Sequence, residues 1–304
     1  TIDAFGRIVE ARYGNGVDLS IATDAAVGAV RAIADTTAST TIQAFTYDWD
    51  RLGNTTLRRD EKFLSQDSAI YDFRGRLERQ VVNYPIAPGG PGSYDEDFTH
   101  THTGNLSRPD FGAYSYPGLG DHQLDGIDSA DPTIKRDFTY DANGNLQSRQ
   151  FPSATPPYTD SFTWSSYDKP LRLTAEAARV DLAYGADHEL IVVDRHDGTG
   201  AQQRSEYFAG MAERLTDGSG ALTDKYYIFA EGRRVAQVVD DGISVAVEYF
   251  HYDALGSVTA LSDASGGIVQ QHRYGPFGKR RKLNGERDDT NTLLFQLPGA
   301  TQFG

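Results

Sequence analysis

Cysteine is missing from the 304-residue sequence altogether. Without thiols, the chain has no disulfide framework, no thiolate metal site and no cysteine nucleophile. This excludes the class of small secreted domains that disulfides hold together, although it leaves secretion itself open.

Positive charge is also scarce, and so are long apolar runs. The sequence has 29 lysines and arginines against 43 acidic residues, a net charge of −14. This argues against a nucleic-acid binder, because phosphate backbones attract clustered positive charge. The most apolar early stretch, residues 25–34, is broken by Gly28 and Arg31 and is much shorter than the roughly 18 residues of a membrane helix. We therefore expect no nucleic-acid partner and no membrane span.

The chain begins at Thr1 without a basic segment followed by an apolar one. No signal peptide is therefore expected within the sequence. We interpret it as a segment of a longer protein, whose targeting signal either lies upstream of Thr1 or does not exist.

What the sequence does contain is aromatic residues and glycine. Only 38% of the residues are hydrophobic, yet 17 are Tyr, 15 are Phe and 31 are Gly. Aromatic side chains favour strands and glycine favours turns, so this mixture indicates β-structure with many turns and wet faces. Helical periodicity is poor throughout, and even residues 25–34 are predicted to form a turn and a strand.

A short motif recurs along the chain: an aromatic residue, Asp, two variable residues and Gly. The first copy has two additional residues before its glycine, and the last has a glycine in place of the Asp. The copies are Tyr47, Asp48 and Gly53; Tyr71, Asp72 and Gly75; Tyr140, Asp141 and Gly144; Tyr252, Asp253 and Gly256; Tyr274 and Gly278. With degenerate copies included, the anchors are about 23 residues apart, the period of two strands and two turns.

The residue types of the motif suit a tight turn between two strands. An aspartate at the end of a strand accepts hydrogen bonds from the next backbone amides, and the glycine three residues later supplies a positive φ that side chains disfavour. Between the turns, segments such as 180–184 and 268–274 alternate in polarity, as strands with two different faces do. The sequence therefore predicts an all-β fold of consecutive hairpins.

These repeats resemble the YD-repeat core of the RHS family, which includes bacterial polymorphic toxins, Tc toxin C components, wall-associated proteins and the teneurin shell. The strongest likeness lies at about 249–281, where YFHYDALGSVTALSDASG is followed by Tyr274, Pro276, Phe277 and Gly278. This stretch is similar to the family's segment near the end of the core. The resemblance extends from about Asp3 to Gly304.

The resemblance implies that β-hairpins wind into a hollow, cocoon-like shell, of which this chain forms all or part. Such shells encapsulate a C-terminal toxin until delivery, in interbacterial competition among other settings. The implied partners are the chain's own C-terminal cargo, neighbouring shell segments and a secretion-system or Tc-type delivery component, and the implied location is secreted or at the cell surface. Because Gly304 falls before the family's core-closing segment and its aspartyl self-cleavage motif, we expect neither self-cleavage nor toxicity in this chain.

Patterns typical of catalysis or metal binding are weak. His100 and His102 would share one face of a strand, with acidic residues 95–97 upstream, but a degenerate repeat followed by a polar loop explains them better. The sequence contains no Gly-x-Ser-x-Gly elbow, His-Glu-x-x-His or phosphate-binding loop. We therefore expect a protein without enzymatic activity, metal or cofactor.

Local composition completes the predicted organisation. Proline and glycine at about 85–97 and 151–158 predict two loops that interrupt the repeats, within one continuous β-domain over 1–304. The basic run Lys279–Lys282 is interpreted as a solvated hairpin end, since it stands alone in an acidic chain.

An alternative function is a cell-surface adhesion or carbohydrate-binding module, in which outward aromatic residues of the repeats stack on sugars or contact a partner protein. Trp49 and Trp164 are the candidate contact residues. Both stand beside repeat motifs, so packing within the wall is the favoured interpretation of the two rings. The shell is accordingly the favoured function.

Overall fold

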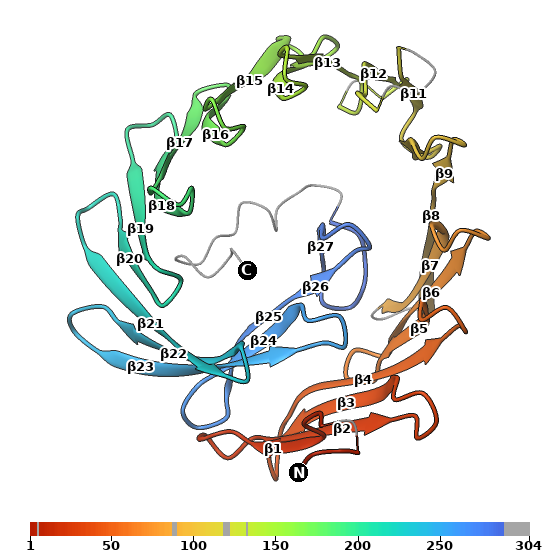
Figure 1. The fold of residues 1–304 in the computed structure, drawn as a ribbon, viewed down its shortest axis with the longest axis vertical. Coiled ribbons are helices and arrows are strands. Elements are labelled where there is room, and N and C mark those ends of the chain that lie inside the picture. The colour runs from red at the N-terminus through yellow and green to blue at the C-terminus, as the bar shows by residue number, and fades with distance from the viewer. Residues whose placement is uncertain (5, 87–89, 118–121, 132, 289–304) are drawn as a thin grey trace. The chain divides into compact units, whose positions relative to one another are not determined.

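The computed structural model describes residues 1–4, 6–86, 90–117, 122–131 and 133–288 (Figure 1). In these ranges the regular elements are strands, numbered β1 to β27, and none is a helix. A helix long and apolar enough to cross a membrane is thus not found in this part of the chain. The predicted all-β fold of consecutive hairpins is confirmed.

The first sheet contains eight strands in chain order, each hydrogen-bonded to the next. Its strands are β1 (Glu10–Arg12), β2 (Asp18–Thr23), β3 (Val30–Thr36), β4 (Thr41–Trp49), β5 (Thr55–Asp60), β6 (Ser65–Tyr71), β7 (Leu77–Ile86) and β8 (Gly90–Asp97). Neighbouring strands from β1 to β7 run antiparallel, so the sheet is a meander of hairpins.

A second sheet also follows chain order, from β11 to β25. Its strands are β11 (Ala113–Ser115), β12 (Gly126–Asp128), β13 (Arg136–Tyr140), β14 (Leu146–Phe151), β15 (Tyr158–Trp164), β16 (Pro170–Ala175), β17 (Ala178–Tyr184), β18 (Leu190–His196), β19 (Gln202–Phe208), β20 (Ala212–Thr216), β21 (Leu222–Ala230), β22 (Arg233–Asp240), β23 (Val245–Tyr252), β24 (Val258–Ser262) and β25 (Ile268–Gln271). Two short pairs stand apart: β9 (Thr99–His100) with β10 (Leu106–Ser107), and β26 (Arg273–Tyr274) with β27 (Arg280–Arg281).

Contacts divide the chain into two compact units. The first unit combines residues 1–96 with residues 226–304, and the second comprises residues 97–225. The first unit therefore brings strands from both ends of the sequence together. The single domain expected from the sequence stays a prediction.

The predicted loop at about 85–97 is strand over its described residues: residues 85–86 end β7, and residues 87–89 lie outside the described residues. Residues 90–97 form β8, whereas residues 152–157 do connect β14 to β15. Pro91 fits because it is the second residue of β8, near the start of the strand, where a missing N–H is tolerated. The acidic run that follows looks like a loop in sequence, yet it is paired in the sheet, and Glu96 is buried.

The apolar core of the first unit joins strands from both ends of the chain. Ile33, Phe45 and Tyr47 form one buried cluster. A second cluster brings Ile42 of β4 against Ala260 of β24. Because side chains alternate along a strand, β4 presents Phe45 and Tyr47 on one face. The core is small, so polar contacts have a large share in holding these strands together.

The turns of the repeat motif share one set of hydrogen bonds. In the copy at 140–144, the Gly144 amide donates to the Asp141 carbonyl at 3.0 Å, and Asp141 Oδ1 accepts from the amides of Asn143 and Asn145 at 2.9 Å each. The Asn145 amide leads the contacts that lower the pKa of Asp141. Gly144 has a φ of +88°, which side chains disfavour. The equivalent amide-to-carbonyl bonds are Gly75 to Asp72 (2.9 Å), Gly256 to Asp253 (3.1 Å) and Gly278 to Gly275 (3.1 Å).

Candidate functional site

In three copies of the repeat motif, the tyrosine ties its hairpin to a backbone carbonyl upstream. Its hydroxyl donates a hydrogen bond to a residue 16 or 18 positions earlier in the chain. The donor–acceptor pairs are Tyr71–Thr55 (2.9 Å), Tyr140–Leu124 (2.9 Å) and Tyr252–Arg234 (2.7 Å). Burial raises the pKa of Tyr140, so the hydroxyl keeps its proton and remains a donor. We call this series of bonds the aromatic ladder.

Trp49 and Trp164 take part in the aromatic ladder. The indole Nε1 of Trp49 donates to the Val30 carbonyl at 2.5 Å, and that of Trp164 donates to the Leu146 carbonyl at 2.7 Å. Both side chains are half-buried. Their N–H groups therefore serve within a sheet, and contact of the two rings with a ligand stays a prediction.

The first copy of the motif lies two residues downstream of its predicted position. The amide of Gly53 donates to the carbonyl of Asp50 at 3.2 Å, which is the turn bond of the motif. The copy is therefore Trp49 and Asp50 followed by Gly53, without an insertion, rather than Tyr47 and Asp48. Two aromatic-Asp pairs precede the same glycine, and the spacing of the motif fits Trp49, Asp50 and Gly53 without an insertion, so the sequence already contained the correct copy.

Tyr47 has a different role, since it joins the first sheet to the motif copy at 252–256. Its side chain is buried in the core, and burial raises the pKa of its hydroxyl above the usual range. The hydroxyl accepts a hydrogen bond from the Ala254 amide at 3.3 Å. Beside it, Arg58 Nη2 lies 3.9 Å from Asp253 Oδ2, and both of these side chains are largely buried.

His100 and His102 do not share a strand. His100 is the last residue of β9, whereas His102 lies in the turn that follows. Strand alternation therefore does not bring the two rings to one face. In the part of the chain that the structure describes, no group of three or more His, Cys, Asp or Glu side chains is arranged to hold a metal ion.

Asp35, His251 and Ser262 form a buried Ser-His-Asp arrangement in the first unit. His251 Nε2 lies 2.8 Å from Ser262 Oγ, and His251 Nδ1 lies 3.3 Å from Asp35 Oδ2. The ring of Tyr13 stands edge-on to the imidazole, with ring centroids 5.0 Å apart. Sequence reasoning missed this set because Asp35 lies in β3, far along the chain from β23 and β24.

The Ser-His-Asp arrangement connects the first sheet to β23 and β24. Asp35, His251 and Ser262 are each 0% exposed, so solvent does not reach the serine hydroxyl. Asn15 Nδ2 donates to that hydroxyl at 2.9 Å, and Gln43 Nε2 donates to Asp35 at 2.6 Å. Hydrogen bonds thus join the first sheet to β23 and β24. A serine that acts as a nucleophile needs, in addition, a path by which its substrate reaches the hydroxyl.

A second buried network joins the first sheet to the segment after β25. Arg273 Nη2 donates to Asp67 Oδ1 at 2.8 Å, and Arg281 Nη2 donates to Glu96 Oε2 at 2.6 Å. The two arginine side chains are 3% and 4% exposed. Burial raises the pKa of Asp60, which lies 3.9 Å from Arg273. We call these residues, with Arg287, the arginine clasp.

The arginine clasp corrects the interpretation of the basic run Lys279–Lys282. Lys279 and Lys282 are exposed, as expected of a solvated hairpin end. Arg281, however, is buried and paired. The sequence could not reveal this, because the acidic partners come from strands about 185 residues away.

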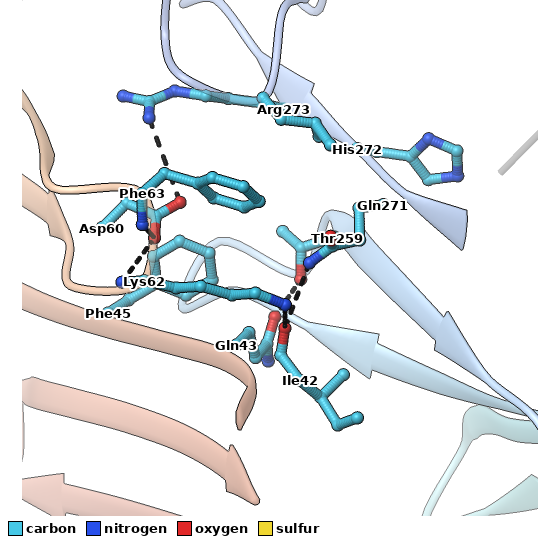
Figure 2. A pocket seen from close by; sticks show the side chains of 11 residues that line it. Ile42, Gln43, Phe45, Asp60, Lys62, Phe63, Thr259, Gln271, His272 and Arg273 are labelled. Carbon is cyan, nitrogen blue, oxygen red and sulfur yellow. Dashed lines mark hydrogen bonds and ion pairs between the residues drawn. The ribbon is translucent and has the colours of Figure 1, made fainter. Parts of the chain in front are cut away.

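A small pocket lies where residues of β4 and β5 meet β24 and residues 271–273 (Figure 2). Lys62 reaches across it and donates from Nζ to the Ile42 carbonyl at 3.1 Å, and burial lowers the pKa of Lys62. The cavity has a volume of about 10 Å³, room for about one water molecule. It is therefore too small to bind a metabolite or cofactor.

No protein-family model and no curated protein matches the sequence. The fold, in contrast, has clear counterparts among solved structures. A crystal structure of TcdB2–TccC3 without its hypervariable C-terminal region matches 96% of this chain, with a TM-score of 0.67 and 15% sequence identity. The chain shares its fold with a Tc toxin.

Two further Tc toxin structures give the same result. TcdB2–TccC3–TEV matches with a TM-score of 0.64 at 14% identity, and the Photorhabdus luminescens Tc holotoxin pore matches with 0.63 at 15% identity. Each match covers 96% of this chain. The chain spans 16% of the length of each of these toxin chains.

Proposed function

We propose that this chain is part of an RHS-type YD-repeat shell, a non-enzymatic wall that encapsulates a C-terminal toxin domain and helps to deliver it. The observation that carries the proposal is the match of 96% of the chain to the fold of TcdB2–TccC3. Because the chain spans 16% of that toxin chain, the proposal assigns it the wall's role and no toxin activity.

The internal contacts suit a wall. Added hairpins extend a sheet through strand pairing, and at Tyr71, Tyr140 and Tyr252 also through a bond of the aromatic ladder, so the structure grows without a thick apolar core. The buried polar networks add cross-links between segments distant in sequence. The enclosed position of the Ser-His-Asp arrangement supports a structural role for it.

The proposed partners are the chain's own C-terminal cargo, neighbouring shell segments and a secretion-system or Tc-type delivery component. One of the similar structures is a Tc holotoxin pore, which supports an association with a toxin. A secreted or cell-surface location is part of the same proposal.

Protease protection in the complete gene product tests the proposal. We expect any polypeptide that follows residue 304 to resist a broad protease while the shell is folded, and to be digested once urea unfolds the shell. The same polypeptide produced alone is the control and should be digested at once. Rapid digestion in the native protein, or a gene product with nothing beyond the repeats, would overturn the proposal.

A further inference from the structure

The segment after β25 is held to the first sheet by side chains. β26 and β27 pair with each other, Arg273 opposite Arg281, as a separate two-stranded sheet. A strand that joins a sheet gains a row of backbone hydrogen bonds. The His272 amide donates to the Thr259 carbonyl of β24 at 2.7 Å, whereas the hairpin that follows meets β5, β6 and β8 through the side chains of the arginine clasp.

The two hairpin arginines have complementary partners. Arg273 bonds to Asp67 and to the hydroxyl of Ser65. Arg281 donates from Nη2 to Gln80 Oε1 at 2.6 Å as well as to Glu96. Guanidinium groups present several N–H donors in a fixed plane, and such charge-assisted bonds specify orientation as well as attraction.

The chain beyond the hairpin is fastened at a second place. Tyr94 of β8 donates to the Gly285 carbonyl at 3.1 Å, and the Arg287 guanidinium stacks over the Tyr94 ring at 4.4 Å. Arg287 also lies 3.9 Å from Glu96. A Cβ on Gly285 would come within 3.2 Å of Arg273, so this glycine allows the close approach. The contacts continue to the end of the described chain.

We propose that the surface of β5, β6 and β8 around Asp67 and Glu96 is a docking site for an arginine-bearing hairpin. In this protein its occupant is the chain's own segment 272–288. Because the site binds through side chains, it retains this segment after the chain is cut at the tip of the hairpin. The inference does not depend on the proposed shell function, since it concerns contacts within the first unit.

A cut at the hairpin tip tests the site in the full chain. Residues 276–279 are exposed, and nothing lies within 4 Å of a Cβ built on Gly278, so a site-specific protease sequence can be inserted there. After cleavage, residues 280–304 are no longer linked to the rest. We expect this fragment to co-elute with the larger fragment in gel filtration and to dissociate slowly, as measured by release of a label at its C-terminus.

Matched variants show whether the arginines hold the fragment. We expect Arg281→Gln to speed dissociation by about tenfold or more, because it removes the buried charge that pairs with Glu96. Lys279→Gln, at an exposed position of the same hairpin, should leave the rate unchanged. Circular dichroism before cleavage verifies that each variant is folded.

Two results would overturn the docking site. One is immediate release of the fragment from the cleaved parent protein, and the other is equal retention by the parent and Arg281→Gln. If Arg281→Gln fails to fold, Arg287→Gln decides the matter, because its side chain is 30% exposed and its loss leaves Glu96 still paired with Arg281. Dissociation of that variant at the parental rate would equally overturn the proposal.

Discussion

Arginine–aspartate pairs between neighbouring strands lie at the surface of both units, but the first unit also buries such pairs between strands that are distant in sequence. In the second unit, residues of neighbouring strands pair at the sheet surface, as Arg204 does with Asp194 at 3.1 Å and Arg214 with Asp224 at 2.7 Å. Both of these arginines are 43% exposed. In the first unit, Arg273 and its partner Asp67 are 206 residues apart in sequence and both almost fully buried.

The difference in burial determines how much each kind of ion pair contributes to the free energy of unfolding. Exposed pairs between adjacent strands contribute at most about 1 kcal/mol, since water screens them and the strands are already neighbours. A buried pair leaves an uncompensated charge when one partner is removed. We infer that strand pairing and the aromatic ladder stabilise both units, and that buried polar contacts between distant segments add to the stability of the first unit.

Replacing one buried arginine should produce the largest change in the free energy of unfolding. We expect Arg273→Gln to lower the free energy of unfolding by about 3 kcal/mol, because buried Asp67 then loses its hydrogen-bonded arginine and keeps Arg281, 3.6 Å away. Arg214→Gln is the matched change in the second unit and should cost about 1 kcal/mol or less. Urea unfolding monitored by circular dichroism measures both, and equal losses would contradict the comparison.

Lowering the pH should destabilise the first unit, because the folded protein disfavours protonation of His272. Burial and the adjacent Arg280 lower the pKa of His272 from 6.5 to about 4. Between these pH values the unfolded chain binds a proton that the folded chain does not, so stability falls as the pH falls from about 6.5 to about 4. We expect the loss from this group to be about 2 kcal/mol after allowance for partial solvent access.

The variant His272→Gln should flatten this part of the pH profile. Urea unfolding at several pH values between 4 and 7 gives the profile, and His188→Gln in the second unit is the control. Parallel profiles for the parent protein and His272→Gln would contradict the assignment.

Each hydrogen bond of the aromatic ladder should contribute about the same stability in the two units. Tyr140→Phe in the second unit and Tyr252→Phe in the first remove one hydroxyl donor each, and we expect each to cost about 1 kcal/mol. Tyr226→Phe is the control, because its side chain is 49% exposed, and should change stability by less than about 0.5 kcal/mol. Thermal unfolding would refute the ladder if all three variants were equally stable.

The smallest expected effect is an increase in stability from a substitution in the hairpin turn between β19 and β20. Ala209 and Gly210 both have positive φ, of 49° and 69°, and the Met211 amide donates to the Phe208 carbonyl at 2.9 Å. This turn type favours Asn-Gly, so Ala209→Asn should stabilise the protein by about 0.5 kcal/mol. Ala212→Asn, in the adjoining strand, should not. A thermal midpoint of Ala209→Asn at or below that of the parent would contradict the expectation.

Much of the local structure could be predicted because its causes lie within a few residues. The turn at 140–144 follows from an aspartate and a glycine three positions apart. The same rule also fits Trp49, Asp50 and Gly53, whereas the prediction placed the first copy at Tyr47 and Asp48. Proline and glycine predict a loop at about 85–97, whereas residues 90–97 form β8 and Glu96 is buried against Arg281.

By itself, the sequence determined the strands, the turns and their order, because hydrogen bonds of Asp and the backbone freedom of Gly act over about five residues. Only the tertiary structure decided which charges are buried and with whom. Asp35 meets His251, and Asp67 meets Arg273, because both ends of the chain fold into one unit. The partner of a buried charged side chain is distant in sequence, so local sequence does not show whether the side chain is buried. Its burial depends on which strands the fold places next to it.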